Sequence, residues 1–308
     1  MIEPVVWTAA HAAASFHVPQ HGDDKYSRGV LGVRTGSIAY PGAAVLGVEA
    51  AWRTGLGMVR YVGPEVVGAR VLTARPETVL CEGRVQAWLV GSGTDASSRG
   101  RAETQAIAAL LEGTLPVVVD AGALDLVVGS VGGAPLVLTP HDREFARLEE
   151  AAGISSAPAT PLAVRIAATR ALADRLGHVV LRKGAATIVA APGGWCATVN
   201  AGTPWLATAG TGDVLGGVIG ALVAAHAARD ASGVADDLGA LAASGAWLHG
   251  VAGRIAAGLA PEAPDTDTDT ATRAGMNDAA WGIPITALDV AHALPAAVAS
   301  VIARVDPR

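Results

Sequence analysis

An aspartate that follows a glycine-rich turn is the chain's clearest candidate for a reacting group. Asp213 comes directly after Ala-Gly-Thr-Gly at 209–212, and the apolar run 214–225 follows it. Backbone N–H groups in such a turn can converge on an anion, and the positive end of a helix dipole adds to the attraction. A carboxylate beside that anion could take the proton of an attacking hydroxyl. The stretch indicates phosphoryl transfer to a small alcohol, and the alternative is a helix N-cap behind a flexible loop.

A lysine and two histidines are further candidates. Lys183 opens the stretch Lys-Gly-Ala-Ala-Thr and could neutralise phosphate, with Gly184 allowing backbone approach and Thr187 supplying a hydroxyl. The alternative is a surface lysine at the start of a hairpin. His141 follows Thr-Pro and could begin a helix or contact a substrate. His249 lies in an apolar stretch, and we expect it to be a core histidine whose hydrogen bonds are satisfied.

Other ligand-binding patterns are weak or missing. The stretch at 91–96, Gly-Ser-Gly-Thr-Asp-Ala, approximates a dinucleotide-binding turn, and Asp120 stands about where a ribose-binding acid would follow. No second feature indicates hydride transfer, and the sequence has neither a P-loop motif nor a zinc-binding pattern. The spacing of three aspartates resembles the start of a calcium-binding loop: Asp265, Asp267 and Asp269. The glycine and glutamate that such a loop needs further along are replaced by Thr270 and Met276. We expect no metal held by the chain's own ligands, and an acidic surface loop over 261–280.

Composition narrows the class of protein. Hydrophobic residues make up 51% of the 308 residues and charged residues 16%, which predicts a large core. A net charge of −6 argues against a nucleic-acid partner. The two cysteines form no redox or metal motif, which fits a reduced cytoplasmic setting, and the first residues lack the basic region of a secretory signal. The apolar runs at 214–228 and 238–260 are too short, or too rich in Ala, Gly and polar residues, for a membrane span of ~20 residues.

The elements that must position these residues alternate between strands and helices. Apolar runs predict strands at 29–36, 57–62, 85–90, 116–120, 135–139 and 178–182, and a hairpin at 187–190 and 195–199. Helical spacing covers 43–55, 99–113, 141–151, 161–176 and 289–303. Residues 1–28 are expected to be irregular. The alternation predicts one α/β domain with a mostly parallel sheet, whose carboxyl ends bring Gly36, Gly91, Asp120, His141 and Lys183 to one edge.

Seven motifs in this order resemble the ADP-dependent NAD(P)H-hydrate dehydratase family of the ribokinase-like superfamily. They are KYSRG at 25–29, GSIAYPGAA at 36–44, VGSG at 90–93, VDAGAL at 119–124, LTPH at 138–141, LRKGAAT at 181–187 and AGTGDVL at 209–215. The resemblance runs from about residue 21 to the end of the chain. It therefore divides the chain into an N-terminal extension, 1–20, and a ribokinase-like domain, 21–308.

The resemblance implies a three-layer α/β/α fold and a cytoplasmic hydro-lyase that repairs nicotinamide nucleotides. ADP, or ATP in eukaryotic relatives, phosphorylates the hydroxyl of (6S)-NADHX or NADPHX with Mg²⁺, and loss of phosphate restores NADH or NADPH. By position, Asp213 would contact the reacting hydroxyl as the catalytic base. The hydrate site would include Ala43, Gly93, His141 and Asp213. The nucleotide site would comprise Lys183, Gly184, Ala185, Ala186, Thr187, Gly210, Thr211 and Gly212.

Two departures qualify the resemblance. The family often has Gly-Pro-Gly-Leu-Gly where this chain has Gly-Ser-Gly-Thr-Asp at 91–95, which puts the contacts of this loop in question. Many bacterial relatives also carry a fused epimerase domain, so epimerisation is expected from another chain. The family implies a homo-oligomer, since relatives are often tetramers, and neither a membrane nor a nucleic-acid partner. The alternatives are a vitamin or thiazole kinase of the same superfamily and a non-enzymatic nucleotide sensor, which would gain little from Asp213.

Overall fold

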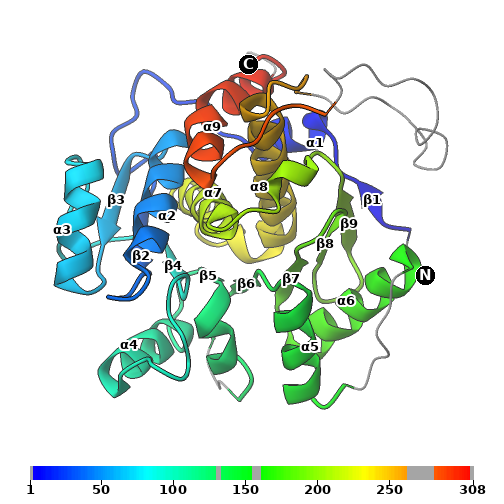
Figure 1. The fold of residues 1–308 in the computed structure, drawn as a ribbon, viewed down its shortest axis with the longest axis horizontal. Helices are drawn as coiled ribbons and strands as arrows, with labels where there is room; N and C mark the ends of the chain where they lie inside the picture. Colours follow the sequence, from blue (N-terminus) through cyan, green and yellow to red (C-terminus); the bar gives the residue numbers. More distant parts are fainter. Residues whose placement is uncertain (1–2, 130–132, 155–160, 262–280, 306–308) are drawn as a thin grey trace.

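The computed structural model describes residues 3–129, 133–154, 161–261 and 281–305, and its centre is a nine-stranded sheet (Figure 1). The strand order is β1-β9-β8-β7-β6-β5-β4-β2-β3. Neighbouring strands are parallel except β8, which is antiparallel to β7 and β9. The strands are β1 (Val5–Val6), β2 (Val30–Arg34), β3 (Met58–Tyr61), β4 (Ala87–Val90), β5 (Val117–Val119), β6 (Leu136–Leu138), β7 (Val179–Arg182), β8 (Thr187–Ala190) and β9 (Cys196–Val199).

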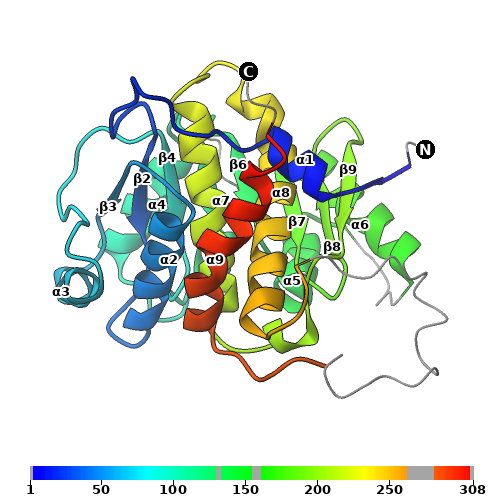
Figure 2. The ribbon, with the colours of Figure 1, turned by 90° about the horizontal axis from the view of Figure 1, so that it is seen from above.

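Helices cover both faces of the sheet, as the sequence predicts (Figures 1 and 2). One face packs against α1 (Ala9–Ala14), α2 (Pro41–Arg53), α7 (Thr211–Ala227), α8 (Val234–Ala256) and α9 (Ala287–Ile302). The other packs against α4 (Arg101–Leu111), η1 (Ala121–Leu126), α5 (Asp142–Ala151) and α6 (Leu162–Leu176). Successive strand residues alternate between these cores: Leu89 and Leu181 lie in the first, Val90 and Val180 in the second. The expected three-layer α/β/α fold is therefore confirmed.

Glycine allows α2 and α7 to pack unusually close together. A Cβ atom at Gly217 of α7 would lie 2.2 Å from the carbonyl oxygen of Gly47 of α2, so any side chain there would force the helices apart. A Cβ atom at Gly216 would lie 3.0 Å from Leu89 Cδ1, and one at Gly220 would lie 2.9 Å from Leu31 Cδ2, so both glycines pack closely on the sheet. These contacts fix where the N-terminus of α7 lies relative to the strands, and Asp213 is in its first turn.

The expectation that residues 1–28 are irregular is wrong over two short segments. Strand β1 pairs in parallel with β9, and α1 packs beside α8 and α9 (Figure 2). Trp7 Nε1 donates a hydrogen bond of 3.1 Å to Ser244 Oγ of α8. A two-residue strand and a one-and-a-half-turn helix carry too few residues for a periodic signal, so only the tertiary contacts reveal them.

The remaining described helices need only brief mention. Helix α3 (Glu65–Ala74) lies beside α2 at the β3 edge of the sheet, and the 3₁₀ turn η2 (Pro204–Leu206) precedes α7. The predicted acidic loop at 261–280 lies outside the described residues, apart from Pro261. No helix in the described ranges has the length and apolarity needed to cross a bilayer.

Candidate active site

The ends of the central strands meet at one edge, which brings together the residues expected there. The backbone N–H of Lys183 donates to Pro140 O at 2.9 Å, and that of Asp120 donates to Val90 O at 3.0 Å. Further along, Gly36 N–H donates to the Ser92 carbonyl at 2.7 Å. The loops after β2, β4, β5, β6 and β7 are therefore neighbours, as expected for parallel strands.

An ion pair between a buried aspartate and a partly exposed lysine forms the centre of this edge. Lys183 Nζ donates to Asp120 Oδ1 at 2.9 Å and lies 3.8 Å from Glu144 Oε2 of α5. The Asp120 carboxylate also accepts hydrogen bonds from Ser92 Oγ at 2.9 Å and Thr139 Oγ1 at 2.8 Å. Burial favours neutral Asp120, but Lys183 and the two hydroxyls outweigh it and hold the pKa below its ordinary value. Asp120 is therefore an ionised anchor for Lys183.

The pKa of Asp213 is shifted in the opposite direction from that of Asp120. Burial raises its pKa to about 7, the negative charge of Asp120 adds to the effect, and Lys183 opposes it. Gly210 occupies the N-cap position of α7, so Asp213 is not the cap residue of that helix. It lies in the first turn, where the helix dipole favours negative charge. A carboxylate with this pKa exchanges a proton readily near neutral pH, which suits a general base.

The turn before Asp213 requires glycine at one position. Gly210 has a φ of 90°, and a Cβ atom there would lie 2.7 Å from Leu46 Cδ1. Position 212 faces the lysine, because a Cβ at Gly212 would be 3.5 Å from Lys183 Nζ. The first backbone N–H groups of α7 thus lie beside the Lys183 ammonium group. Free N–H donors next to a positive charge suit an anionic ligand.

A cavity of about 490 Å³ opens from this turn. Six of the residues predicted to bind nucleotide line it: Lys183, Gly184, Ala185, Thr187, Thr211 and Gly212. Ala186 and Gly210 are not among its lining residues. The other lining residues are mostly apolar, and sequence reasoning did not select them as site residues: they include Val199, Pro204, Leu206, Leu215, Ala246 and Gly250, together with His249. Its walls thus come from β8, β9, the 201–207 segment, α7 and α8.

Two of the residues predicted for the hydrate site contact each other. Gly93 has a φ of 68°, and a Cβ atom there would lie 2.5 Å from Ala43 Cβ and 2.9 Å from Tyr40 O. The small residues therefore hold the loop after β4 against the start of α2. This loop, 91–95, is the one whose sequence differs from the family pattern. In it, the Asp95 carboxylate accepts hydrogen bonds from the backbone N–H and the hydroxyl of Ser97, and the Ser92 hydroxyl donates to Asp120. Ser92 and Thr139 were missed as site residues because only the fold reveals their common partner.

His141 has a structural role at the start of α5. Its Nδ1 atom accepts from the backbone N–H groups of Arg143 and Glu144 at 3.1 and 3.2 Å, completing a capping box with the Glu144 side chain. The ring is half-exposed, and Nε2 lies 3.5 Å from Glu144 Oε1. A contact between His141 and a substrate would thus be made by the Nε2 side of the ring.

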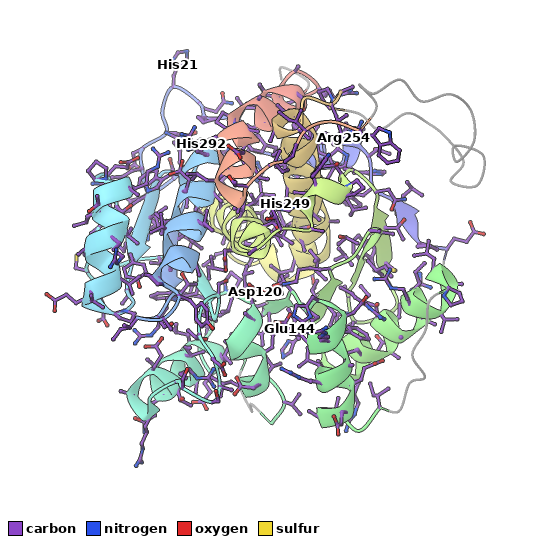
Figure 3. All side chains as sticks on the ribbon, in the orientation of Figure 1. His21, Asp120, Glu144, His249, Arg254 and His292 are labelled. Carbon is purple, nitrogen blue, oxygen red and sulfur yellow. The ribbon has the colours of Figure 1, made fainter. Side chains whose placement is uncertain are left out.

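The expectation for His249 is confirmed for its burial and wrong for its hydrogen bonding. Although the ring is buried, its Nε2 atom has no hydrogen-bond partner among the described residues, and the ring lines the cavity beside α7. Figure 3 labels His249 on α8 near the centre of the view, with Asp120 and Glu144 below it. The sequence places His249 in an apolar helix but cannot show that this face of the helix borders a cavity.

Comparison with known proteins assigns the family. Residues 31–270 match the family model for NAD(P)H-hydrate dehydratase. A bifunctional NAD(P)H-hydrate repair enzyme of Mycobacterium tuberculosis is 47% identical over 228 residues, covering 70% of this chain and 45% of the relative. The ADP-dependent (S)-NAD(P)H-hydrate dehydratase of Neisseria meningitidis is 35% identical, covering 80% of this chain and 84% of its own. The chain spans about half the length of the bifunctional relatives that it matches.

Solved structures agree on the fold. The ADP/ATP-dependent NAD(P)H-hydrate dehydratase of Bacillus subtilis, crystallised with ATP and Mg²⁺, superposes with a TM-score of 0.74 at 24% identity, covering 96% of this chain and 98% of its own. A hydroxyethylthiazole kinase of Pyrococcus horikoshii shares the fold at a TM-score of 0.56 and 15% identity, covering 88% and 89%. The fold alone therefore does not separate a dehydratase from a kinase, and the sequence match decides. On that match, the chain belongs to the NAD(P)H-hydrate dehydratase family.

Proposed function

We propose that this protein is a hydro-lyase that repairs hydrated nicotinamide nucleotides, using ADP to dehydrate (6S)-NADHX or NADPHX to NADH or NADPH. The observation that carries the proposal is Asp213, a carboxylate with a pKa of about 7 in the first turn of α7. It directly follows Gly212, which lines the cavity and faces Lys183. Phosphoryl transfer to an alcohol needs a base at this place. We assign this activity to residues 21–308, with 1–20 as an extension whose β1 and α1 pack on that domain.

The cavity is the proposed nucleotide site. Its volume of about 490 Å³ lies in the range of small-ligand pockets, and its walls are mostly apolar, as an adenosine group requires. Lys183 and the N–H groups at 210–212 lie at one end and suit the phosphates. Gly184, Ala185 and Thr187 line the cavity from the β7–β8 turn and the start of β8, and Ala186 lies between them in sequence.

The acidic side chains around Lys183 fit a Mg²⁺ ion that arrives with the nucleotide. Glu144 and Asp213 supply hard oxygen ligands, whereas Asp120 is already occupied by Lys183 and two hydroxyls. Among the described residues, no group of three or more His, Cys, Asp or Glu side chains could hold a metal. Glu144 and Asp213 alone would therefore be too few to hold the ion, which would take its remaining ligands from the phosphates and water and would neutralise phosphate charge.

In the first chemical step, Asp213 removes the proton of the C6 hydroxyl. The hydroxyl oxygen then forms a bond to the terminal phosphorus of ADP, and the bond between that phosphorus and the bridging oxygen breaks to release AMP. Lys183 and the α7 N–H groups stabilise the charge on the phosphoryl oxygens as it moves. General-base assistance of this kind contributes about 10²–10⁴ in rate.

In the second step, phosphate leaves from C6. The lone pair of the ring nitrogen forms a double bond to C6 as the C6–O bond breaks, and loss of the C5 proton restores the dihydropyridine. The reaction therefore consumes one ADP and releases AMP and phosphate for each water removed. Because the phosphate ester is a far better leaving group than hydroxide, the kinase step makes the dehydration possible.

The hydrate would lie on the other side of the phosphoryl group from the nucleotide. We propose Ala43, Gly93, the Nε2 side of His141 and Asp213 as its contacts. Ala43 and Gly93 are packed together at the start of α2, so this part of the site has no large side chain from either residue. A small-residue surface suits the close approach of a flat nicotinamide ring.

We further propose a cytoplasmic homo-oligomer, with a tetramer as the expected state, that works without membrane or nucleic-acid partners. The bifunctional relatives are named as repair enzymes and are about twice the length of the matched region. An epimerase that converts the R hydrate to the S form would act upstream of this activity.

The test is to incubate the protein with NADHX, ADP and Mg²⁺ and to follow dihydronicotinamide absorbance, with a control that lacks nucleotide. Recovery of absorbance together with equal amounts of AMP and phosphate supports the proposal. A stable phosphorylated product without NADH would instead identify a small-molecule kinase. Replacing ADP with ATP in the same assay tests the choice of phosphoryl donor.

A further inference from the structure

A second cavity opens in the helical layer opposite α7 and α8. Its volume is about 460 Å³, and its described lining residues come from the loop after β4, from η1 and the residues that follow it, and from α5. None of these residues lines the proposed nucleotide cavity. A cavity of this size can hold a group as large as a nucleoside, and the chemical steps described above do not use it.

Helix α5 gives this cavity a direction. Its lining residues Glu144, Arg147, Leu148 and Ala151 have i, i+3, i+4 and i+7 spacing, so they share one face of the helix. At the near end, Glu144 Oε2 lies 3.8 Å from Lys183 Nζ. Because a helix rises about 1.5 Å per residue, Ala151 lies roughly 10 Å further along the axis. The cavity therefore extends away from the reaction centre for about two turns of α5.

Two loops join the near end of the cavity to the proposed hydrate site. Thr94 follows Gly93, Ala121 follows Asp120, and both Thr94 and Ala121 line the cavity. Ala121 has a φ of 48°, a conformation that persists in a residue with a side chain only where its surroundings impose it. A Cβ atom at Gly122 would overlap the carbonyl oxygen of Thr94, so the two loops touch here. A ligand held at Gly93 and reaching past Thr94 would enter the cavity.

The charged side chains of the wall are mostly acidic, namely Asp95, Asp125, Glu144 and Arg147. Asp125 is paired, since its two carboxylate oxygens accept from Arg99 Nη2 at 3.0 and 2.8 Å. Asp95 is exposed and forms no ion pair with a described residue. Hydrogen bonds from Ser97 hold the pKa of Asp95 below its ordinary value, so it is ionised at neutral pH. Even with Arg99 and Arg147 included, the wall keeps a net negative charge.

We propose that this cavity binds the adenosine end of the dinucleotide hydrate and that Asp95 makes the enzyme prefer NADHX to NADPHX. The inference rests on the dehydratase function proposed above. The pyrophosphate would lie near Arg147, one turn beyond Glu144, and the apolar surface of Leu148 and Val128 suits the adenine. NADPHX carries an additional 2′-phosphate with nearly two negative charges, which an ionised carboxylate in the wall repels.

The test compares the full chain on three substrates at saturating ADP and Mg²⁺: NADHX, NADPHX, and the hydrate of reduced nicotinamide mononucleotide, which lacks the adenosine end. We expect kcat/KM for NADHX to exceed that for NADPHX about tenfold, the scale of one like-charge contact near a protein surface. The preference should shrink when the salt concentration is raised from about 50 to about 500 mM, because salt screens exposed charges.

Two variants assign the preference to residues. Asp95→Asn keeps an acceptor for Ser97 and should raise kcat/KM for NADPHX about 5- to 10-fold, with NADHX within about twofold of the wild type. Arg147→Gln should raise KM for both dinucleotides about tenfold but leave the mononucleotide hydrate unchanged, since that substrate does not reach the pyrophosphate position. Glu150→Gln is the matched control, because Glu150 is an exposed acid of α5 that does not line the cavity.

Several results would overturn the inference. Equal kcat/KM for the two dinucleotides in the wild type, or a preference for NADPHX, refutes the specificity without any variant. A preference that survives in Asp95→Asn, or that Glu150→Gln reduces equally, shows that Asp95 is not its source. If Arg147→Gln slows the mononucleotide hydrate as much as the dinucleotides, or slows none of them, the cavity does not hold the adenosine end. If the wild type dehydrates none of the three substrates, the proposed function itself fails, which is a separate result.

Discussion

Lys183 donates a 2.9 Å hydrogen bond to Asp120, and this pair gives two nearby aspartates opposite properties. Asp120, satisfied by Lys183, Ser92 and Thr139, has a pKa below its ordinary value. Asp213 has a pKa of about 7 because it is buried and repelled by the Asp120 charge. One acid therefore stays ionised and positions the lysine, whereas the other can exchange a proton near neutral pH.

The Asp120–Lys183 pair should be important for stability. Asp120→Asn leaves the Lys183 ammonium without the buried carboxylate that it pairs with, and we expect the free energy of unfolding to fall by about 3 kcal/mol. The measurement is urea unfolding at neutral pH. Glu103→Gln is the control, because the Glu103 side chain is 20% exposed, against 4% for Asp120, and its ion pair with Arg34 should contribute about 1 kcal/mol or less. Equal losses in the two variants would contradict a special role for Asp120.

Activity should depend on the ionisation of Asp213. Because the base must be deprotonated, kcat/KM should rise about tenfold per pH unit below pH 7 and level off above it. The charge of Asp120 raises the pKa of Asp213, so in Asp120→Asn the rising part of the pH profile should move to lower pH. The readout is a pH profile of NADH recovery at saturating ADP. A flat profile between pH 5 and 8, or a limb that Asp120→Asn leaves in place, would refute the assignment.

Asp213 should also reduce stability at neutral pH. Its folded pKa lies above its unfolded pKa, so the ionised form is disfavoured by folding, and stability falls as pH rises from about 4 to about 7. We therefore expect Asp213→Asn to be more stable than the wild type by about 1–2 kcal/mol at pH 8, with a smaller difference at pH 5. Urea unfolding at both pH values measures this. A destabilised variant at pH 8 would show that the carboxylate is favourably paired instead.

The turn at Gly210 offers a test of geometry. Gly210→Ala places a Cβ 2.7 Å from Leu46 in a left-handed conformation, so we expect a loss of about 2–3 kcal/mol in stability and weakened ADP binding. Gly193→Ala is the matched control. Gly193 has a φ of 83° in the β8–β9 turn but nothing within 4 Å, so it carries the backbone strain alone, about 1 kcal/mol, and should bind ADP normally. If the control lost ADP binding as well, the effect at Gly210 would not be local.

Much of the site could be predicted because strand ends carry local signals. Glycine and acidic residues directly after apolar runs mark strand exits, and a parallel sheet brings such exits to one edge. The ionisation of Asp120 and the hydrogen bonding of His249 could not be predicted, since they depend on which residues the fold brings next to these side chains. Ser92 and Thr139 are far apart in sequence yet share the Asp120 carboxylate, and α8 borders the cavity only through its packing on the 201–202 backbone. The short β1 and α1 lack periodicity and depend on tertiary contacts.

The central claim is that Asp213 is the base for phosphoryl transfer, and Asp213→Asn tests it most directly. Calorimetry should show ADP binding within about twofold of the wild type, because the variant keeps Lys183, the α7 N–H groups and the cavity. Turnover of NADHX by the same preparation should fall about 10²–10⁴-fold. Near-normal turnover with intact binding would contradict the account and leave Asp213 as a first-turn acid of α7 with no part in the chemistry.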